Sequence, residues 1–277
     1  MLARQRQERI LDQVRLEGGV RVGDLVELLN VSDMTVRRDI AVLARRGLVA
    51  RVHGGATALT GRSTEEPAFA LKSTLQTLQK AGIARAAAGL VQPGDSVGIS
   101  GGTTTHAVAR ELRSIPNLTV VTNSLPVAET LHDTGRDDLT VILTGGTRTP
   151  SDALVGPVSV AMLRSIHVDW LFLGVHGFDE RAGLTSPNLV EAEANRALIA
   201  SARQVVVTAD ATKWGVVGLS SMARLEDVDV LVTDDSLRED ACRAVTAAVG
   251  RLLLTGSHNG VTTPPTPPTS ASESEHG

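Results

Sequence analysis

Glycines and hydroxyl-bearing side chains gather where a strand-like run gives way to a segment with helical spacing. Residues 98–105 (GISGGTTT) form this junction. Small residues let the backbone approach an anion closely, and free N–H groups at the start of a helix bind it with help from the helix dipole. The hydroxyls of Thr103, Thr104 and Thr105 add donors. The segment predicts an anion-binding loop, although such a turn can also be only a tight connection between a strand and a helix.

Two other polar segments follow apolar runs in the same way. They are residues 122–124 (TNS) and residues 144–146 (TGG). Because ligands of open α/β sheets bind at the carboxyl ends of the strands, we expect both segments to converge with residues 98–105. Asn123, Gly145 and Gly146 are therefore candidates for the same ligand site.

A second group of polar side chains lies near the N-terminus. Apolar residues at helical spacing predict helices over 4–16 and 22–29, and Ser32 is a suitable N-cap for a third helix ending near Arg46. The polar face of this third helix carries Thr35, Arg37, Arg38 and Asp39. Arginine can bond bidentately to guanine edges or to phosphates, which favours DNA binding. Two adjacent arginines can also be only a solvated surface.

The rest of the N-terminal segment predicts a small β-wing. Residues 48–52 have strand character and are followed by Gly54 and Gly55. Arg51 and His53 on this wing could reach the DNA backbone or minor groove. The candidate DNA-binding residues are Ser32, Thr35, Arg37, Arg38, Arg51 and His53.

Beyond residue 82, short apolar runs alternate with helical patterns. Strands are expected at 96–100, 118–123, 139–144, 170–175, 204–210 and 229–234, and helices near 104–113, 125–133, 157–165, 189–202 and 236–249. The strands are rich in β-branched residues and nearly continuous, as is typical of strands buried on both faces. The fold class is therefore α/β, with an N-terminal winged helix-turn-helix followed by a mostly parallel, Rossmann-like sheet.

These patterns divide the chain into four parts. We expect a winged helix-turn-helix domain over 1–57, a linker over 58–80, an α/β domain over 81–252 and a disordered tail over 253–277. The tail is rich in Pro, Ser and Thr and has no apolar periodicity.

Charge and composition narrow the possible functions. The net charge is −4, but residues 1–60 carry 10 Arg against 7 Asp and Glu, so positive charge is concentrated where phosphates would be met. Three Phe, two Trp and no Tyr argue against a base-stacking surface for single strands. The lone Cys242 can form no internal disulfide or thiolate metal site, and no apolar run is long enough for a membrane span. We expect a cytoplasmic protein with no membrane partner, cofactor or metal.

The segment from Val31 to Ala56, VSDMTVRRDIAVLARRGLVARVHGGA, resembles the signature of the DeoR/GlpR family of bacterial transcription regulators. The match includes Ser32, Thr35, Arg37, Arg38 and the RVHGGA run. The resemblance implies that these four side chains face a double-stranded DNA operator. We expect Asp39 to orient an arginine rather than to touch DNA, since phosphates repel a carboxylate.

The runs WLFLGVHGFD (170–179), GLT (183–185) and TADATKWG (208–215) are similar to the sensor domain of the same family. This resemblance implies a fold related to ribose-5-phosphate isomerase and a phosphorylated sugar or related metabolite as ligand. Lys213 is one of only three lysines among 27 Lys and Arg, which suggests that a compact ammonium is needed there. It can also be only a surface lysine at a strand end.

Two departures from the family pattern affect the expected ligand. Ser100 and His176 stand where many relatives have Asp, which removes two acceptors for sugar hydroxyls. The candidate effector-binding residues are Ser100, Gly101, Gly102, Thr103, Thr104, Thr105, Asn123, Gly145, Gly146, His176 and Lys213.

The main alternative function is a phosphosugar isomerase-like enzyme, because the fold is shared. In our alignment the isomerase carboxylates fall on Leu173 and His176, which leaves that route without a base and predicts no catalytic residue. A purely structural DNA-binding protein would not need the α/β domain. We therefore expect a repressor of a sugar or carbon-metabolism operon, released by a phosphorylated sugar or related metabolite and active as a homodimer or homotetramer.

Overall fold

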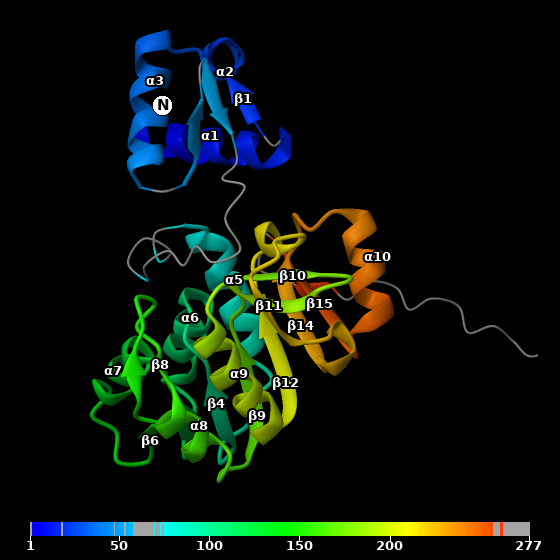
Figure 1. Ribbon diagram of the computed structural model, residues 1–277. Coiled ribbons are helices and arrows are strands. Elements are labelled where there is room, and N and C mark those ends of the chain that lie inside the picture. Colours follow the sequence, from blue (N-terminus) through cyan, green and yellow to red (C-terminus); the bar gives the residue numbers. More distant parts are fainter. Residues whose placement is uncertain are drawn as a thin grey trace, which may run out of the picture.

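The computed structural model describes residues 2–17, 19–46, 48–52, 54–57, 69, 73, 75–256 and 261–262 (Figure 1). A small N-terminal domain precedes a larger α/β domain. Within the described residues, no helix combines the length and the apolar composition that crossing a membrane requires.

The N-terminal domain contains three helices and a three-stranded antiparallel sheet. The helices are α1 (Ala3–Glu17), α2 (Val22–Leu29) and α3 (Asp33–Arg45), and the strands are β1 (Gly19–Arg21), β2 (Ala50–Val52) and β3 (Gly55–Thr57), in the order β1-β3-β2. The three helices and the wing confirm the prediction, and Ser32 is the N-cap of α3. Strand β1 was not predicted, because three residues are too few to show a period of two.

The core of this domain comes from the apolar stripes of its helices. Side chains from all three helices are fully or almost fully buried, among them Ile10, Val14, Leu25, Val36, Ile40 and Leu43. These are the positions that the helical spacing predicted to face inward.

One charged side chain, Asp39, lies in this apolar core. Its carboxylate accepts hydrogen bonds from Arg6 Nε at 2.5 Å and from Gln7 Nε2 at 2.9 Å. The Arg6 and Asp39 side chains are only 13% and 5% exposed, so this is a buried ion pair that joins α1 to α3. Asp39 orients an arginine as expected, but the expectation that Asp39 lies on the polar face of α3 is wrong, because it is buried against Arg6 of α1.

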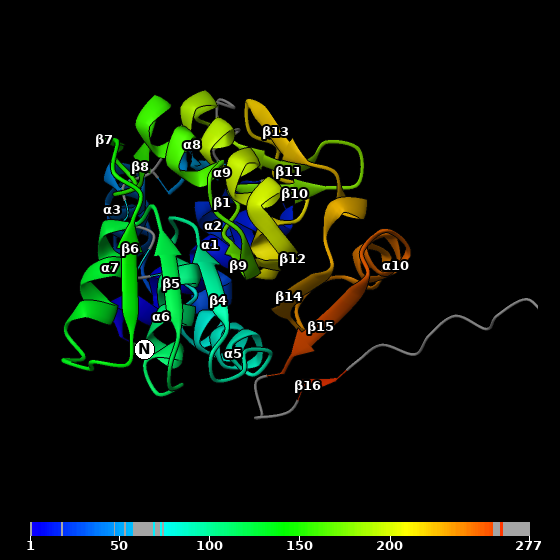
Figure 2. The ribbon, with the colours of Figure 1, turned by 90° about the horizontal axis from the view of Figure 1, so that it is seen from below.

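The larger domain is built on an eight-stranded sheet in the order β16-β15-β14-β12-β9-β4-β5-β6, which Figure 2 shows from below. All neighbouring strands are parallel except β15 and β16. The strands are β4 (Ser96–Ile99), β5 (Thr119–Thr122), β6 (Thr140–Leu143), β9 (Val168–Leu173), β12 (Ala202–Thr208), β14 (Val230–Asp234), β15 (Arg251–Thr255) and β16 (Val261–Thr262). The six predicted strands are confirmed as β4, β5, β6, β9, β12 and β14.

Helices cover both faces of the sheet. They are α5 (Thr77–Ala88), α6 (Thr103–Leu112), α7 (Leu125–His132), α8 (Pro157–Leu163), α9 (Leu189–Ser201) and α10 (Glu239–Ala248). Helices α5, α6 and α7 contribute to one buried apolar cluster, and α8, α9 and α10 contribute to the other. This is the doubly wound arrangement that alternating strands and helices predict.

Short elements that the sequence did not predict complete the domain. A second antiparallel sheet contains β10 (Gly177–Asp179), β11 (Gly183–Ser186) and β13 (Ser220–Ala223), and β7 (Thr147–Arg148) pairs with β8 (Leu154–Val155). Two short 3-10 helices are η1 (Ala211–Lys213) and η2 (Leu225–Asp227).

The structure also differs from the sequence analysis at both ends of this domain. Helix α5 begins at Thr77, inside the expected linker. Residues 253–255 were expected to be disordered, but they belong to β15, whose Leu252 and Leu253 side chains are buried. Of the remaining predicted tail, the described residues are Gly256, Val261 and Thr262.

We predict that Asp39→Ala destabilises the N-terminal domain by about 3 kcal/mol, because it leaves the charge of Arg6 buried without its partner. Asp33→Ala is the matched control, since it removes an exposed carboxylate from the same helix and should cost at most about 1 kcal/mol.

Urea unfolding of the full chain measures both effects. Both tryptophans, Trp170 and Trp214, lie in the α/β domain, so their fluorescence follows that domain while far-UV circular dichroism follows both. Asp39→Ala should shift only the dichroism transition. Equal shifts for the two variants would contradict a structural role for the buried pair.

Candidate functional site

The N-terminal turn of α3 presents two hydroxyl groups that bond to each other. Ser32 Oγ accepts a hydrogen bond from the Thr35 backbone N–H at 3.3 Å and lies 2.9 Å from Thr35 Oγ1. Ser32 is exposed and Thr35 is half-buried. The capping bond fixes the start of the helix, so both hydroxyls have a defined position on its outer surface.

The arginines on the same helix differ in their surroundings. Arg37 Nε donates to Asp33 Oδ1 at 2.5 Å, and the hydrogen bond and charge of Asp33 raise the pKa of the Arg37 guanidinium. Arg38 is exposed and makes no ion pair or side-chain hydrogen bond with any residue that the structure describes. To contact a phosphate or a base, Arg37 would have to release Asp33, whereas Arg38 would have no such bond to break. Arg51 is exposed on β2, and His53 lies outside the described residues.

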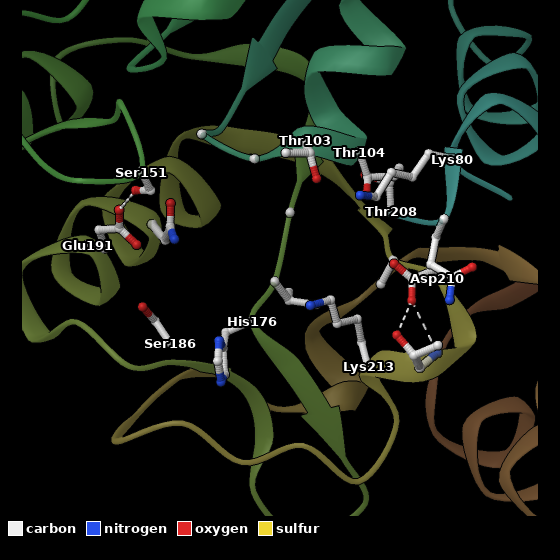
Figure 3. A pocket seen from close by; sticks show the side chains of 18 of the residues that line it. Lys80, Thr103, Thr104, Ser151, His176, Ser186, Glu191, Thr208, Asp210 and Lys213 are labelled. Atoms are coloured by element: carbon white, nitrogen blue, oxygen red, sulfur yellow. Dashed lines mark hydrogen bonds between the residues drawn. The ribbon is translucent and has the colours of Figure 1, made fainter. Parts of the chain in front are cut away.

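A cavity lies at the carboxyl ends of three neighbouring strands, β4, β9 and β12 (Figure 3). At β4 and β9 the chain changes direction across the sheet, since β5 and β6 follow on one side and β12, β14 and β15 on the other. Such a switch point is where open α/β sheets bind ligands. Six predicted residues line the cavity: Gly101, Gly102, Thr103, Thr104, His176 and Lys213.

Three other predicted residues lie behind this loop and hold it in place. Asn123 Oδ1 accepts from the Gly101 N–H at 3.0 Å, and Asn123 Nδ2 donates to the Leu154 carbonyl at 3.2 Å. The Thr105 hydroxyl donates to the Ser100 carbonyl at 2.8 Å. The Ser100 hydroxyl accepts from the Gly174 N–H at 2.9 Å, which joins the ends of β4 and β9. The structure therefore places Ser100, Thr105 and Asn123 in supporting positions and not on the cavity wall.

Close packing explains the glycine at position 101. A Cβ atom added there would lie 2.9 Å from the Cβ of Ala153, which is too close for any side chain. The Gly101 N–H is already bonded to Asn123, so the donors left for an anion are those of the first turn of α6. Residues in that turn have no partners inside the helix, and no side chain caps them.

Gly145 and Gly146 do not line the cavity. They follow β6, which lies at the edge of the sheet, two strands away from β4. Gly146 has φ +119°, and a Cβ there would lie 2.5 Å from the Val155 carbonyl oxygen. Both glycines lie in the turn between β6 and β7. The expectation that residues 144–146 converge with the other two polar segments is therefore wrong.

One end of the cavity carries positive charge and hydroxyl donors. Lys80 on α5 and Lys213 on η1 are two of the three lysines of the chain, and both line the cavity. Lys80 is 7% exposed, and its Nζ donates to the Leu75 carbonyl at 2.7 Å. Figure 3 shows its side chain extending toward Thr104 and Thr208. The buried Thr208 hydroxyl makes no hydrogen bond with any described residue, so it can still donate to a ligand.

The opposite side carries acceptors. The Glu191 carboxylate on α9 accepts from the Thr149 hydroxyl at 3.0 Å and from the Ser151 hydroxyl. Asp210 also lines the cavity, but Figure 3 shows it beside Thr208, at the end that carries the lysines, where its Oδ1 accepts from the Thr212 N–H at 3.2 Å. The cavity therefore contains two carboxylates, although Ser100 and His176 stand where relatives have Asp. Among the described residues, no group of His, Cys, Asp and Glu is arranged to hold a metal ion.

Lys80 and Glu191 were not among the predicted site residues, most of which follow strands. Both lie on helices, which the fold brings to the strand ends. The rarity of lysine was a signal for Lys80, whereas no local pattern marked Glu191. Asp210 lies in the TADATKWG run, but no role was assigned to it.

Two family models match the chain. The model of the DeoR-like helix-turn-helix domain matches residues 6–62, and that of the DeoR C terminal sensor domain matches residues 75–235. A ribose 5-phosphate isomerase from Methanocaldococcus jannaschii aligns with 50% of this chain and 54% of its own, at 18% identity and a TM-score of 0.37. That structural likeness is too weak to support an inference about activity.

Proteins named as transcription regulators resemble the chain over most of its length. An uncharacterized HTH-type transcriptional regulator of Escherichia coli K12 is 37% identical, over 88% of this chain and 95% of that protein. The glycerol-3-phosphate regulon repressor of the same strain is 36% identical, over 83% and 90%. The regulator GlpR of Haloferax volcanii is 35% identical, over 90% and 96%.

The helix-turn-helix match implies DNA binding, and the sensor match implies a small-molecule effector. The chain belongs to the DeoR family of transcription regulators.

Proposed function

We propose that the chain is a cytoplasmic repressor of a sugar or carbon-metabolism operon, and that a phosphorylated sugar or a related metabolite releases it from DNA. The observation that carries the proposal is the polarity of the cavity, with two lysines and the start of α6 at one end and the Glu191 carboxylate at the other. A phosphate ester of a polyhydroxy compound matches this arrangement, because its phosphate is an anion and its hydroxyl groups are hydrogen-bond donors.

The positive end suits a phosphate dianion better than a neutral sugar. Unbonded N–H groups at a helix N-terminus bind phosphates, and the dipole of α6 adds to the charges of Lys80 and Lys213. The hydroxyls of Thr104 and Thr208 can donate to the remaining phosphate oxygens. A neutral hydroxyl is a weaker acceptor for the lysine ammonium groups than a phosphate dianion.

The acceptor end suits the hydroxyl groups of the same ligand. Hydroxyls donate well to a carboxylate, and Thr149 and Ser151 hold Glu191 in one orientation. Glu191 thus supplies a carboxylate acceptor in a cavity where Ser100 and His176 replace two Asp residues of relatives. The named relative that represses a glycerol-3-phosphate regulon is consistent with this class of effector.

The DNA-binding half works through α3 and the wing. One domain of this size, with an excess of only three positive charges over residues 1–60, binds a specific site weakly. Two symmetry-related half-sites would raise the affinity by avidity. We therefore propose that a homodimer or homotetramer binds the double-stranded operator.

We predict that Arg38→Ala weakens binding to a specific duplex by about 5- to 150-fold, which corresponds to the loss of one bidentate base contact. Arg45→Ala is the matched control, because it removes an exposed arginine from the last turn of the same helix. A duplex selected from a random library by the wild-type chain supplies the site, and fluorescence anisotropy at two salt concentrations gives the affinities. If both variants bind equally well, α3 does not contact DNA through Arg38.

We predict that sugar phosphates bind the full chain and that their parent sugars bind at least about tenfold more weakly, since a charge-assisted bond to phosphate is lost. Lys213→Met should weaken only the esters, because it removes charge from the phosphate end. Arg243→Met is the control, since Arg243 is an exposed cation on α10 that pairs with Glu239.

Isothermal calorimetry with matched pairs of sugars and esters measures these affinities. Binding of free sugars but of no ester would overturn the proposed ligand class. Ester binding that is the same in wild type and Lys213→Met would overturn the assigned phosphate end.

A further inference from the structure

Lys80 connects the cavity with the segment that leads to the DNA-binding domain. Its side chain lines the cavity. Its Nζ donates a hydrogen bond of 2.7 Å to the carbonyl of Leu75, just before α5. The Lys80 backbone N–H also donates to the carbonyl of Gln76 at 2.9 Å. A single residue therefore bonds to both consecutive carbonyls at the start of α5.

Leu75 touches the other domain. Its half-buried side chain packs against the apolar core of the N-terminal domain, together with Val26 and Leu48. Asp12 of α1 and Gln76 and Gln79 of the α5 region line a common surface hollow. The position of the Leu75 peptide thus influences how the DNA-binding domain is held.

The residue between Leu75 and α5 has an unfavourable backbone conformation. Gln76 has φ +51° and ψ +41°, in the left-handed region that a non-glycine residue seldom adopts. It also stands at the N-cap of α5, where an extended conformation is usual, and its side chain makes no capping bond. The two hydrogen bonds from Lys80 help to hold this conformation, and weakening them would let the segment relax.

We propose that Lys80 transmits effector binding to the DNA-binding domain, because a bound phosphate competes with the Leu75 carbonyl for its ammonium group. A phosphate dianion is a stronger acceptor than a neutral carbonyl. Once the ammonium turns toward the phosphate, the residues around Gln76 relax and Leu75 leaves its contact with the N-terminal domain. This inference rests on the proposed phosphate end of the cavity and adds the path by which it acts.

Hydrogen exchange of the full chain tests the path, with inorganic phosphate as the probe. In wild type, saturating phosphate should speed the exchange of amides 75–80 by about 5- to 150-fold, the range of ordinary allosteric coupling. Lys80→Met should exchange fast at these amides without phosphate, and phosphate should not speed it further. Unchanged protection of β4 and β9 shows that the fold is retained, and Lys80→Gln provides a second neutral variant with a similar stem.

Lys213→Met is the matched control, since it removes the other lysine of the cavity. It should need more phosphate to saturate but then show the wild-type increase at amides 75–80. Calorimetry identifies saturation in each variant. If phosphate saturates wild type without changing these amides, or if the Lys80 variants keep the full response, the coupling role is wrong. If phosphate does not bind wild type at all, the phosphate end of the proposed function fails and this inference fails with it.

Discussion

The hydrogen bond from the Gly101 N–H to the Asn123 side chain determines the geometry of the cavity at the ends of β4, β9 and β12. It joins the ends of the neighbouring strands β4 and β5, and the second bond of Asn123, to the Leu154 carbonyl, fixes the amide in one orientation. Asn123 is 2% exposed, so water does not compete for these bonds. Only glycine fits at position 101, because Ala153 lies against it. The first turn of α6 is thereby directed at the cavity, with N–H groups that have no partner inside the helix.

The other polar groups of the cavity derive their positions from this arrangement and from the sheet topology. Gly174 and His176 follow β9, and Lys213 follows β12, so the strand order brings them beside the loop that follows β4. Helices from opposite faces of the sheet then add Lys80 and Glu191. In our account, the phosphate lies between α6 and the lysines, and the ligand hydroxyls lie toward Glu191. We propose that Lys80 couples phosphate binding to the position of Leu75 and so to the DNA-binding domain.

Local patterns were sufficient to predict some parts of this molecule. The Gly-Thr run at residues 101–105 has a composition that suits one local geometry, and the N-cap at Ser32 depends on residues three apart, so both were predictable. The same holds for long β-branched strands such as β9 and β12. The polar role of Asn123 was also recognisable, but its partner is the loop backbone and not the ligand. That distinction depends on which strands are neighbours.

Contacts between distant segments could not be predicted. Asp39 was expected to orient an arginine, yet its partner Arg6 is 33 residues away on another helix. Glu191 reaches the cavity through the packing of α9, and Lys80 belongs to a helix that seemed to be part of a linker. Strands β10, β11 and β13 (GFD, GLTS and SSMA) contain no run of β-branched apolar residues of the kind that marked β5 and β6.

The most direct test of this account is the mutual effect of DNA and effector on each other's binding. The affinity of the full chain for its selected duplex is measured with and without a saturating sugar phosphate, and the affinity for that ester is measured with and without the duplex. Linkage requires the two ratios to be equal. The account predicts that each ligand weakens the other by the same factor, about 5- to 150-fold. Ester binding that is equally tight, or tighter, on the DNA-bound protein would contradict it.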